Sequence, residues 1–537
     1  MSLLWAASLL LLGADPIADT VVVCPEVFGE ALEPWIQHRE KQGHQFAFVS
    51  NEQTPEAIRS DIREVAKSGG LRTIVLVGDA DPRATADSRV AAVTTPTYQT
   101  AAKVNVLWGS EPTIATDTTY ADLDDDLLPD VAIGRLSVDT PHQLTAIINK
   151  IIAYETQRPP GVWRRRVNFV AGVGGFGAVA DNVIETATKK VLTEGIPAAY
   201  ETSMTYGSWR SPFCPDPRHF HQATVDRLNE GSLFWVYIGH GQRRFLDRVR
   251  TPAGYYHILD TDDVDKIHCT NGCPIAIFLA CYTGSFDELS DCLGEEMVRA
   301  ADGPVAALCG SRVTMPYAMA VMGNELMDQY FVKRRKTLGE LVMYTKRQMV
   351  RELQADEQAA KSTRHLLDSI AAVISPAPEM LDEERREHVL MFNLLGDPLL
   401  RLDHPHEIAL TTVNEAAAGS ELRVSGTTSI DGQCTIELIC RRDRLKNRFV
   451  ARPFFDPRDE ALSDYTTVYA QSNDRQWTNN SFECSAGDFD SVLKIPAHAV
   501  GPCYVRVFVE NMHGFGLGAT ELYVRQTGPN RQVSDSN

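Results

Sequence analysis

The sequence lacks two features that would point to nucleic acids or membranes as partners. It has no excess of basic residues, because 52 Lys and Arg stand against 71 Asp and Glu and give a net charge of −19. Such a charge disfavours binding to nucleic acids or anionic membranes. Beyond residue 14, no apolar run is long enough to cross a bilayer. We therefore expect no nucleic-acid partner and no membrane-spanning segment.

The sequence also lacks the motifs of nucleotide and zinc sites. The glycine-rich turn at 173–177 has neither the G-x-x-x-x-G-K-S/T pattern nor the G-x-G-x-x-G spacing that hold phosphates. Cys269 and Cys273 are four residues apart, but no second pair at metal-binding spacing accompanies them. The 11 cysteines are an odd number, so at least one thiol has no partner within the chain.

The first residues carry the one strongly apolar segment outside the expected fold. The run from Ser2 to Ala14 is too short for a membrane span and ends in small residues. This pattern is typical of the apolar core of a secretory signal peptide, although no Lys or Arg precedes it. We predict a signal peptide at 1–15 and a secreted, periplasmic or cell-surface protein.

Two apolar runs in the middle of the chain each end in a chemically reactive residue. Residues 232–238 lead into Gly239, His240 and Gly241, and residues 274–280 lead into Cys281. Runs of this length, bounded by small residues, are typical of strands buried on both faces of a parallel sheet. The carboxyl ends of such strands form the ligand crevice of an open α/β sheet. We therefore expect His240 and Cys281 to lie over the same crevice.

A histidine and a cysteine in one crevice can act as a catalytic dyad. The imidazole of His240 would take the proton of the Cys281 thiol, and the thiolate would attack a carbonyl carbon. The backbone N–H groups of Gly241 and Cys281 are candidates for an oxyanion hole. A lone cysteine after an apolar run is more often a packing residue, so the hypothesis depends on the two residues together.

The segments around these residues resemble the catalytic core of the gingipain-type cysteine peptidases, which belong to the caspase-like clan. The matching segments are 130–137, 237–241, 278–281 with 285–287, and 392–398, and a β-rich tail follows them. The resemblance implies a cysteine endopeptidase that acts on protein or peptide substrates through a thioester acyl-enzyme. It also implies cleavage after Arg or Lys, provided that an acidic residue lies in the specificity pocket.

The same resemblance implies binding roles for residues outside the dyad. Asp181 matches the floor of the primary specificity pocket in the arginine-specific members, and a helix N-cap explains it equally well. Tyr317 is the candidate for the aromatic wall of that pocket. Asp122, Asp124 and Asp126 begin like a calcium loop but lack its glycine, and a solvated acidic turn is the alternative. A structural calcium ion and a solvated turn both stay open for this loop, and we expect no cofactor for the chemistry.

Strand-like and helix-like segments alternate up to about residue 402, and short alternating runs follow Pro405. These patterns predict an α/β fold and then a β-sandwich. With the resemblance, we expect two caspase-like subdomains with parallel-rich sheets flanked by helices, followed by a C-terminal Ig-like β-sandwich. The expected parts are an N-terminal subdomain (19–157), a catalytic subdomain (162–402), the sandwich (405–526) and a disordered tail (527–537).

Two departures from the family pattern leave a second function class open, a non-catalytic surface or binding protein. Val173 stands where gingipains have the glutamate that orients the histidine, and no long propeptide precedes the first strand. A related alternative passes the acyl group to an amine, as a sorting transpeptidase of this family does. The sequence leaves the oligomeric state undefined.

Charged residues near the dyad are expected to be solvated. Arg243, Arg244, Arg248 and Arg250 follow His240 in a long polar loop and are interpreted as an exposed face. Asp287 and Glu288, which follow Cys281, are also expected to be exposed.

Overall fold

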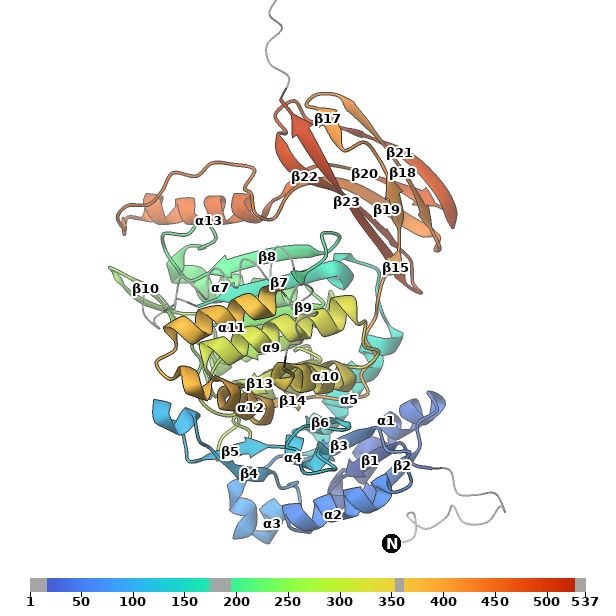
Figure 1. Cartoon of the computed structure of the whole chain (residues 1–537), viewed down its shortest axis with the longest axis vertical. Helices are drawn as coiled ribbons and strands as arrows, with labels where there is room; N and C mark the ends of the chain where they lie inside the picture. The colour runs from blue at the N-terminus through green and yellow to red at the C-terminus, as the bar shows by residue number, and fades with distance from the viewer. Residues whose placement is uncertain (1–16, 173, 175–194, 353–361, 527–537) are drawn as a thin grey trace, which may run out of the picture.

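The computed structural model describes residues 17–172, 174, 195–352 and 362–526. Its centre is a ten-stranded sheet with the order β2-β1-β3-β6-β14-β13-β12-β9-β7-β8 (Figure 1). The strands are β1 (Thr20–Val23), β2 (Phe46–Val49), β3 (Thr73–Val77), β6 (Ala132–Leu136), β7 (Arg166–Ala171), β8 (Glu201–Tyr206), β9 (Phe234–Ile238), β12 (Ile275–Leu279), β13 (Ala306–Gly310) and β14 (Phe392–Leu395).

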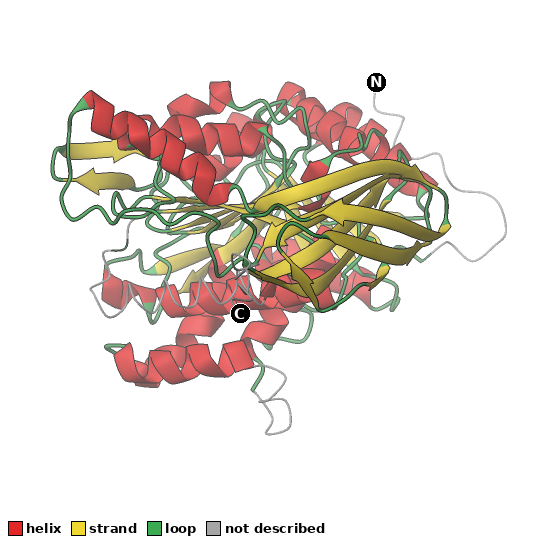
Figure 2. Ribbon diagram, turned by 90° about the horizontal axis from the view of Figure 1, so that it is seen from above, coloured by secondary structure: helices red, strands yellow, loops and turns green. Residues whose placement is uncertain are grey.

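Helices cover both faces of this sheet, as Figure 2 shows. The described α-helices of this part are α1 (Gly29–Lys41), α2 (Pro55–Ala66), α3 (Ser88–Ala91), α4 (Thr118–Ala121), α5 (Pro141–Thr156), α7 (Phe220–Asn229), α8 (Leu293–Arg299), α9 (Pro316–Met327), α10 (Leu338–Val350), α11 (Ser362–Ile374) and α12 (Leu381–Met391). Because both faces are covered, β3 and β12 are buried throughout, and every residue of β12 is apolar. The predicted fold class, a parallel-rich sheet flanked by helices, is confirmed.

The helix starts follow local sequence signals. The hydroxyl of Thr140 accepts a hydrogen bond from the N–H of Gln143, and the side-chain oxygen of Gln143 accepts one from the N–H of Thr140. Pro141 occupies the first helical turn, where its missing N–H is not needed. Together these residues start α5, the helix that leads from the first expected subdomain to the second.

The two expected α/β subdomains contribute to one continuous sheet rather than to two. Strands β1, β2, β3 and β6 come from the first, and the other six from the second. They meet where Leu395 of β14 pairs with Arg135 of β6. Strand β14 runs antiparallel to β13 and lies between β13 and β6 in the sheet. The expected boundary between 157 and 162 stays a prediction.

Two small hairpins extend from the central sheet. The first pairs β4 (Tyr98–Ala101) with β5 (Thr113–Thr116), and the second pairs β10 (Arg248–Thr251) with β11 (Gly254–His257). We call residues 98–116, which include the first hairpin, the β4–β5 arm. Within the part of the chain that the structure describes, no helix is long and apolar enough to cross a bilayer.

The C-terminal part consists of a six-stranded and a three-stranded sheet that share a separate apolar core. The strands are β15 (His406–Glu407), β16 (Ala409–Thr411), β17 (Glu415–Ala417), β18 (Glu421–Thr428), β19 (Gly432–Cys440), β20 (Gln476–Cys484), β21 (Gly487–Lys494), β22 (Gly501–Glu510) and β23 (Phe515–Arg525). C-terminal β sheets are confirmed, and their Ig-like classification stays a prediction. The expected signal peptide and tail lie outside the described residues.

A helix within the C-terminal part covers the edge of the central sheet. Helix α13 (Asp459–Asn473) connects β19 to β20 and lies beside the edge strand β8 (Figure 1). The side-chain amide of Asn473 accepts a hydrogen bond from the N–H of Met204 at 2.8 Å and donates one to its carbonyl at 3.0 Å. This contact satisfies backbone groups that an edge strand leaves open. The all-β expectation for 405–526 missed this helix.

Candidate active site

The structure places His240 and Cys281 at the same carboxyl edge of the central sheet, beyond the ends of two neighbouring strands. Strand β9 is parallel to β12, and Ile238 lies opposite Leu279 in their register. His240 and Cys281 each follow two residues after that pair. Because adjacent strands are about 4.8 Å apart, both residues follow neighbouring strand ends at one edge of the sheet, as the sequence suggested. Their catalytic roles stay predictions.

Gly241 packs directly against the residue that it was expected to assist. A Cβ atom at Gly241 would lie 2.6 Å from the backbone oxygen of Cys281, so a side chain cannot be accommodated there. Gly241 forms a bridge with Leu246, and its flanking residues make the hydrogen bonds of that bridge. In such an antiparallel pair the N–H of Gly241 points away from Leu246. This orientation suits an oxyanion donor.

The Cys281 thiol contacts Thr314, a residue that the sequence interpretation missed. The backbone N–H of Thr314 donates to Sγ of Cys281 at 3.3 Å, and the Thr314 hydroxyl lies 3.5 Å from the same sulfur. The same sulfur also lies 3.7 Å from the carbonyl oxygen of Thr314, so this one residue surrounds it with a backbone donor, a hydroxyl and a backbone acceptor. Thr314 follows β13, the next strand of the sheet, so its position after a strand end could have identified it.

Helix α12 fixes the turn that carries Thr314. Nε2 of the buried His388 accepts a hydrogen bond from the N–H of Met315 at 2.8 Å, while its Nδ1 bonds the Glu384 carbonyl at 2.7 Å. Burial lowers the pKa of His388 to about 4, so the ring is neutral and Nδ1 carries the proton. The Glu384 carboxyl accepts from the N–H of Ala318 at 3.1 Å. Glu384 and His388, which lie one turn apart on α12, thus bind the backbone of Met315 and Ala318, directly after Thr314.

The residue after the proposed nucleophile has an unusual backbone conformation. Tyr282 has a φ of 57°, in the left-handed region that few residues other than glycine adopt. Its N–H donates to the carbonyl of Arg312 at 3.1 Å, and its hydroxyl donates to Glu111 at 2.9 Å. Strained residues persist only where such surrounding contacts determine them, and they cluster at functional sites.

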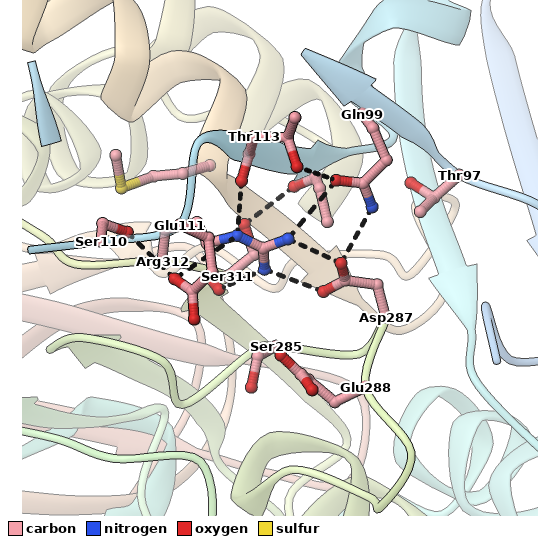
Figure 3. Close-up of polar contacts among 12 residues, drawn as sticks. Thr97, Gln99, Ser110, Glu111, Thr113, Ser285, Asp287, Glu288, Ser311 and Arg312 are labelled. Carbon is pink, nitrogen blue, oxygen red and sulfur yellow. Dashed lines mark hydrogen bonds and ion pairs between the residues drawn. The ribbon is translucent and has the colours of Figure 1, made fainter. Parts of the chain in front are cut away.

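The expectation that Asp287 is exposed is wrong, whereas the Arg243 side chain is 41% exposed, as expected, and makes two ion pairs. The Asp287 side chain is only 10% exposed and pairs with the buried Arg312 at 2.6 Å (Figure 3). Arg243 pairs with Glu111 at 2.7 Å and with Glu288 at 2.6 Å. The physical reason is that the β4–β5 arm packs against these turns and supplies partners that a local sequence pattern does not reveal.

The family assignment follows from a match over most of the chain. The model of peptidase family C25 matches residues 14–403, which include both strand ends and the segments on either side. The chain belongs to peptidase family C25. This membership confirms the resemblance noted in the sequence and supports the predicted enzyme class, a cysteine-type endopeptidase.

Individual relatives of this C25 chain are distant. Lys-gingipain from Porphyromonas gingivalis is 23% identical over 305 residues, which are 54% of this chain and 15% of the relative. The crystal structure of the Arg-specific cysteine proteinase gingipain R has a TM-score of 0.51 at 15% identity and covers 96% of this chain and 99% of that one. A complex of P. gingivalis RgpB pro- and mature domains has a TM-score of 0.52 at 16% identity, with 95% and 100% covered. These structures support the fold alone.

The expected specificity residues of the C25 chain are only partly described. Asp181 and Val173 lie outside the described residues. The hydroxyl of Tyr317 donates to Asp368 at 2.7 Å, and the ring is also in contact with Arg385. Tyr317 lines a cavity of about 470 Å³ together with Arg351, Glu352, Arg364, His365, Asp368, Pro378, Glu379, Leu381, Asp382 and Arg385. Its role as a pocket wall stays a prediction.

The expected calcium ligands are grouped differently from the prediction. Asp122 and Asp124 lie within 4.8 Å of Asp130, while the Asp126 carboxylate accepts from the N–H of Leu128. The donors are all oxygens, as calcium prefers. However, the Asp122 carboxylate already accepts from two backbone N–H groups and pairs with a guanidinium. The loop therefore satisfies its buried acid without an ion, and calcium binding stays a prediction.

Proposed function

We propose that this chain is a cysteine endopeptidase with His240 as the general base and Cys281 as the nucleophile. The observation that carries the proposal is the register of β9 and β12, which sets both residues at one edge of the sheet, two positions after Ile238 and Leu279. Parallel α/β sheets bind ligands at this edge. Membership of a peptidase family supports the same reaction class.

The first half of the reaction forms a thioester. His240 accepts the thiol proton, and Sγ of Cys281 attacks the carbonyl carbon of the scissile peptide bond. The N–H groups of Gly241 and Cys281 would hold the oxygen as it becomes negative. The C–N bond then breaks, and the imidazolium of His240 gives its proton to the leaving amine. The Thr314 N–H, at 3.3 Å from Sγ, stabilises the sulfur whenever it carries negative charge.

The second half releases the acyl group. His240 takes a proton from water, the resulting hydroxide attacks the thioester carbon, and the thiolate leaves. An amine in place of water would give transpeptidation, the related alternative. Adding a primary amine to the assay and searching for the amide product by mass distinguishes the two acceptors.

We propose Arg or Lys as the residue before the scissile bond. The names of the relatives, Lys-gingipain and the Arg-specific gingipain R, support this choice. The net charge of −19 favours the approach of basic substrates, although salt screens this effect. We also propose a secreted, periplasmic or cell-surface location, which the apolar run at 2–14 supports.

A peptide cleavage assay tests the reaction and the specificity together. The full chain is incubated with matched peptides that differ only in Arg, Lys, Ala or Asp at one position, and the products are identified by mass. We expect cleavage after Arg or Lys, and its loss in Cys281→Ala and His240→Ala. If the chain cleaves none of the peptides but binds one of them, the result would favour the non-catalytic binding protein.

A further inference from the structure

One carboxylate contacts the turns on both sides of the proposed dyad. Glu111, in the β4–β5 arm, accepts a hydrogen bond from the hydroxyl of Tyr282 at 2.9 Å and pairs with Arg243 at 2.7 Å. Tyr282 directly follows Cys281, and Arg243 lies three residues after His240. A residue of the first α/β part of the chain therefore connects the nucleophile turn to the histidine turn.

We infer that Glu111 is a positioning residue that fixes the Cys281 turn relative to the His240 turn. The inference rests on the proposed function, since it concerns the alignment of that dyad. Proton transfer and nucleophilic attack both require the reacting atoms to be held in a narrow geometry. Each catalytic residue comes from a different strand end, so the backbone turns beyond the strands need a connection of their own.

The contacts around Tyr282 show why this connection matters. The left-handed backbone of Tyr282 is strained, and three contacts oppose its relaxation. These are its N–H on the Arg312 carbonyl at 3.1 Å, its hydroxyl on Glu111, and its ring under the Arg243 guanidinium, 5.2 Å from the ring centre. Two of the three pass through Glu111 or its ion-pair partner. Loss of the Glu111 charge would therefore loosen the turn that carries Cys281.

The surrounding charges keep Glu111 ionised. Burial raises the pKa of Glu111, but its own backbone N–H, the Tyr282 hydroxyl and the charge of Arg312 lower it to below its usual value. The other acids in this cluster have partners of their own, because Asp287 pairs with Arg312 and Glu288 pairs with Arg243. Glu288 reaches the His240 turn from the Cys281 segment itself, whereas Glu111 contacts both turns from the first α/β part of the chain.

The arm that carries Glu111 is itself anchored to the catalytic part (Figure 3). The backbone oxygen of Thr113 accepts from Nε of Arg312 at 2.7 Å, and the Gln99 amide donates to Asp287 at 2.9 Å. These contacts hold the arm on both sides of Glu111. The first α/β part is consequently connected to the turns around the dyad through this anchored hairpin.

The test compares Glu111→Gln and Tyr282→Phe with the matched control Glu288→Gln. Glu288 pairs with the same arginine from the Cys281 segment, so Glu288→Gln removes one ion pair of Arg243 and leaves both contacts of Glu111 in place. We expect kcat to fall by about 10- to 100-fold in both test variants, with KM within about twofold of wild type. We expect Glu288→Gln to lose less than about threefold. Combining the two test substitutions should cost no more than either alone, because both break one connection.

A second readout separates positioning from general destabilisation. The rate of iodoacetamide alkylation at Cys281, measured at neutral pH and located by mass, should fall in Glu111→Gln and Tyr282→Phe but not in Glu288→Gln, because thiol activation depends on its alignment with His240. If wild type is active and selectively alkylated while Glu111→Gln matches Glu288→Gln, the inference fails and the peptidase proposal stands. If wild type is neither active nor selectively alkylated, the peptidase proposal fails and takes the inference with it. Should Glu111→Gln not fold, Tyr282→Phe decides alone.

Discussion

The α/β part that carries His240 and Cys281 contacts two other parts of the chain, at opposite edges of the central sheet. These are the first α/β part and the C-terminal sheets. At the carboxyl edge, the β4–β5 arm reaches the dyad through partly exposed polar groups such as Glu111. At the amino edge, Arg165 immediately precedes β7 and forms a buried ion cluster with Glu437 and Arg506 of the C-terminal sheets. The first interface should therefore affect chemistry, and the second should affect stability.

The largest expected effect is at the amino edge. Substituting Glu437→Ala leaves the buried Arg165 without its counter-charge and leaves the buried Arg506 with only the more distant Glu201 at 3.9 Å. We expect the free energy of unfolding to fall by about 3–5 kcal/mol, measured by urea denaturation. Alkylation of Cys281 in the folded protein should be unchanged. The exposed pair of Arg423 and Asp490 offers a control, since Asp490→Asn should leave the unfolding midpoint unchanged.

Acid titration examines the same interface without a substitution. Burial raises the pKa of Glu437, but Arg506 and Arg165 lower it more strongly and hold it at about 2, below the ordinary 4.5. A carboxyl with a lowered pKa stabilises the fold above its unfolded value and loses that contribution as the pH falls. We expect about 3 kcal/mol to be lost between about pH 4.5 and pH 2. Glu437→Gln should remove this part of the pH dependence, and an unchanged acid limb would contradict the account.

A substitution under the arm should change stability and chemistry together. Asp287→Ala removes the ion pair with Arg312, whose side chain is only 3% exposed. We expect a loss of about 2 kcal/mol in unfolding free energy, because a buried guanidinium loses its charged partner. Unlike Glu437→Ala, it should also slow peptide cleavage. Full activity in the folded Asp287→Ala variant would remove the distinction between the two interfaces.

The smallest expected effect concerns the covered edge strand. Asn473→Ala deletes the two hydrogen bonds to the backbone of Met204. We expect about 1–2 kcal/mol of lost stability and no change in peptide cleavage. Asn480→Ala, which removes an exposed hydrogen bond to Ser491 within the C-terminal sheets, is the matched control. Equal losses in the two variants would mean that α13 does not protect this edge.

The parts of the fold that the sequence predicted well are those set by local patterns. The apolar runs before His240 and Cys281 showed two buried strands and their reactive ends, because burial on both faces leaves a continuous apolar signature. Helix α13 carried a readable pattern as well, since Leu462, Tyr465 and Tyr469 have helical spacing, but the surrounding β-like runs obscured it.

What the sequence could not supply depends on which strands become neighbours. The pairing of Leu395 with Arg135 joins segments about half a chain apart, and no local pattern specifies it. The charge of Asp287 looked solvated for the same reason, because its partner Arg312 comes from another element. Thr314 follows a predicted strand, but it contacts Cys281 through its backbone N–H. Almost every residue has this group, so no side-chain pattern points to it.

The most direct test of the central claim is the rate of alkylation of Cys281 by iodoacetamide in the folded full chain. Adducts are assigned by mass between pH 5 and 9, in wild type and in His240→Ala. The account predicts that Cys281 reacts faster than every other cysteine, and that His240→Ala slows it by at least about tenfold at neutral pH. Cys24 is an internal reference, because burial raises the pKa of its thiol to about 12. Equal rates for Cys281 and Cys24, or an undiminished rate in His240→Ala, would contradict the account.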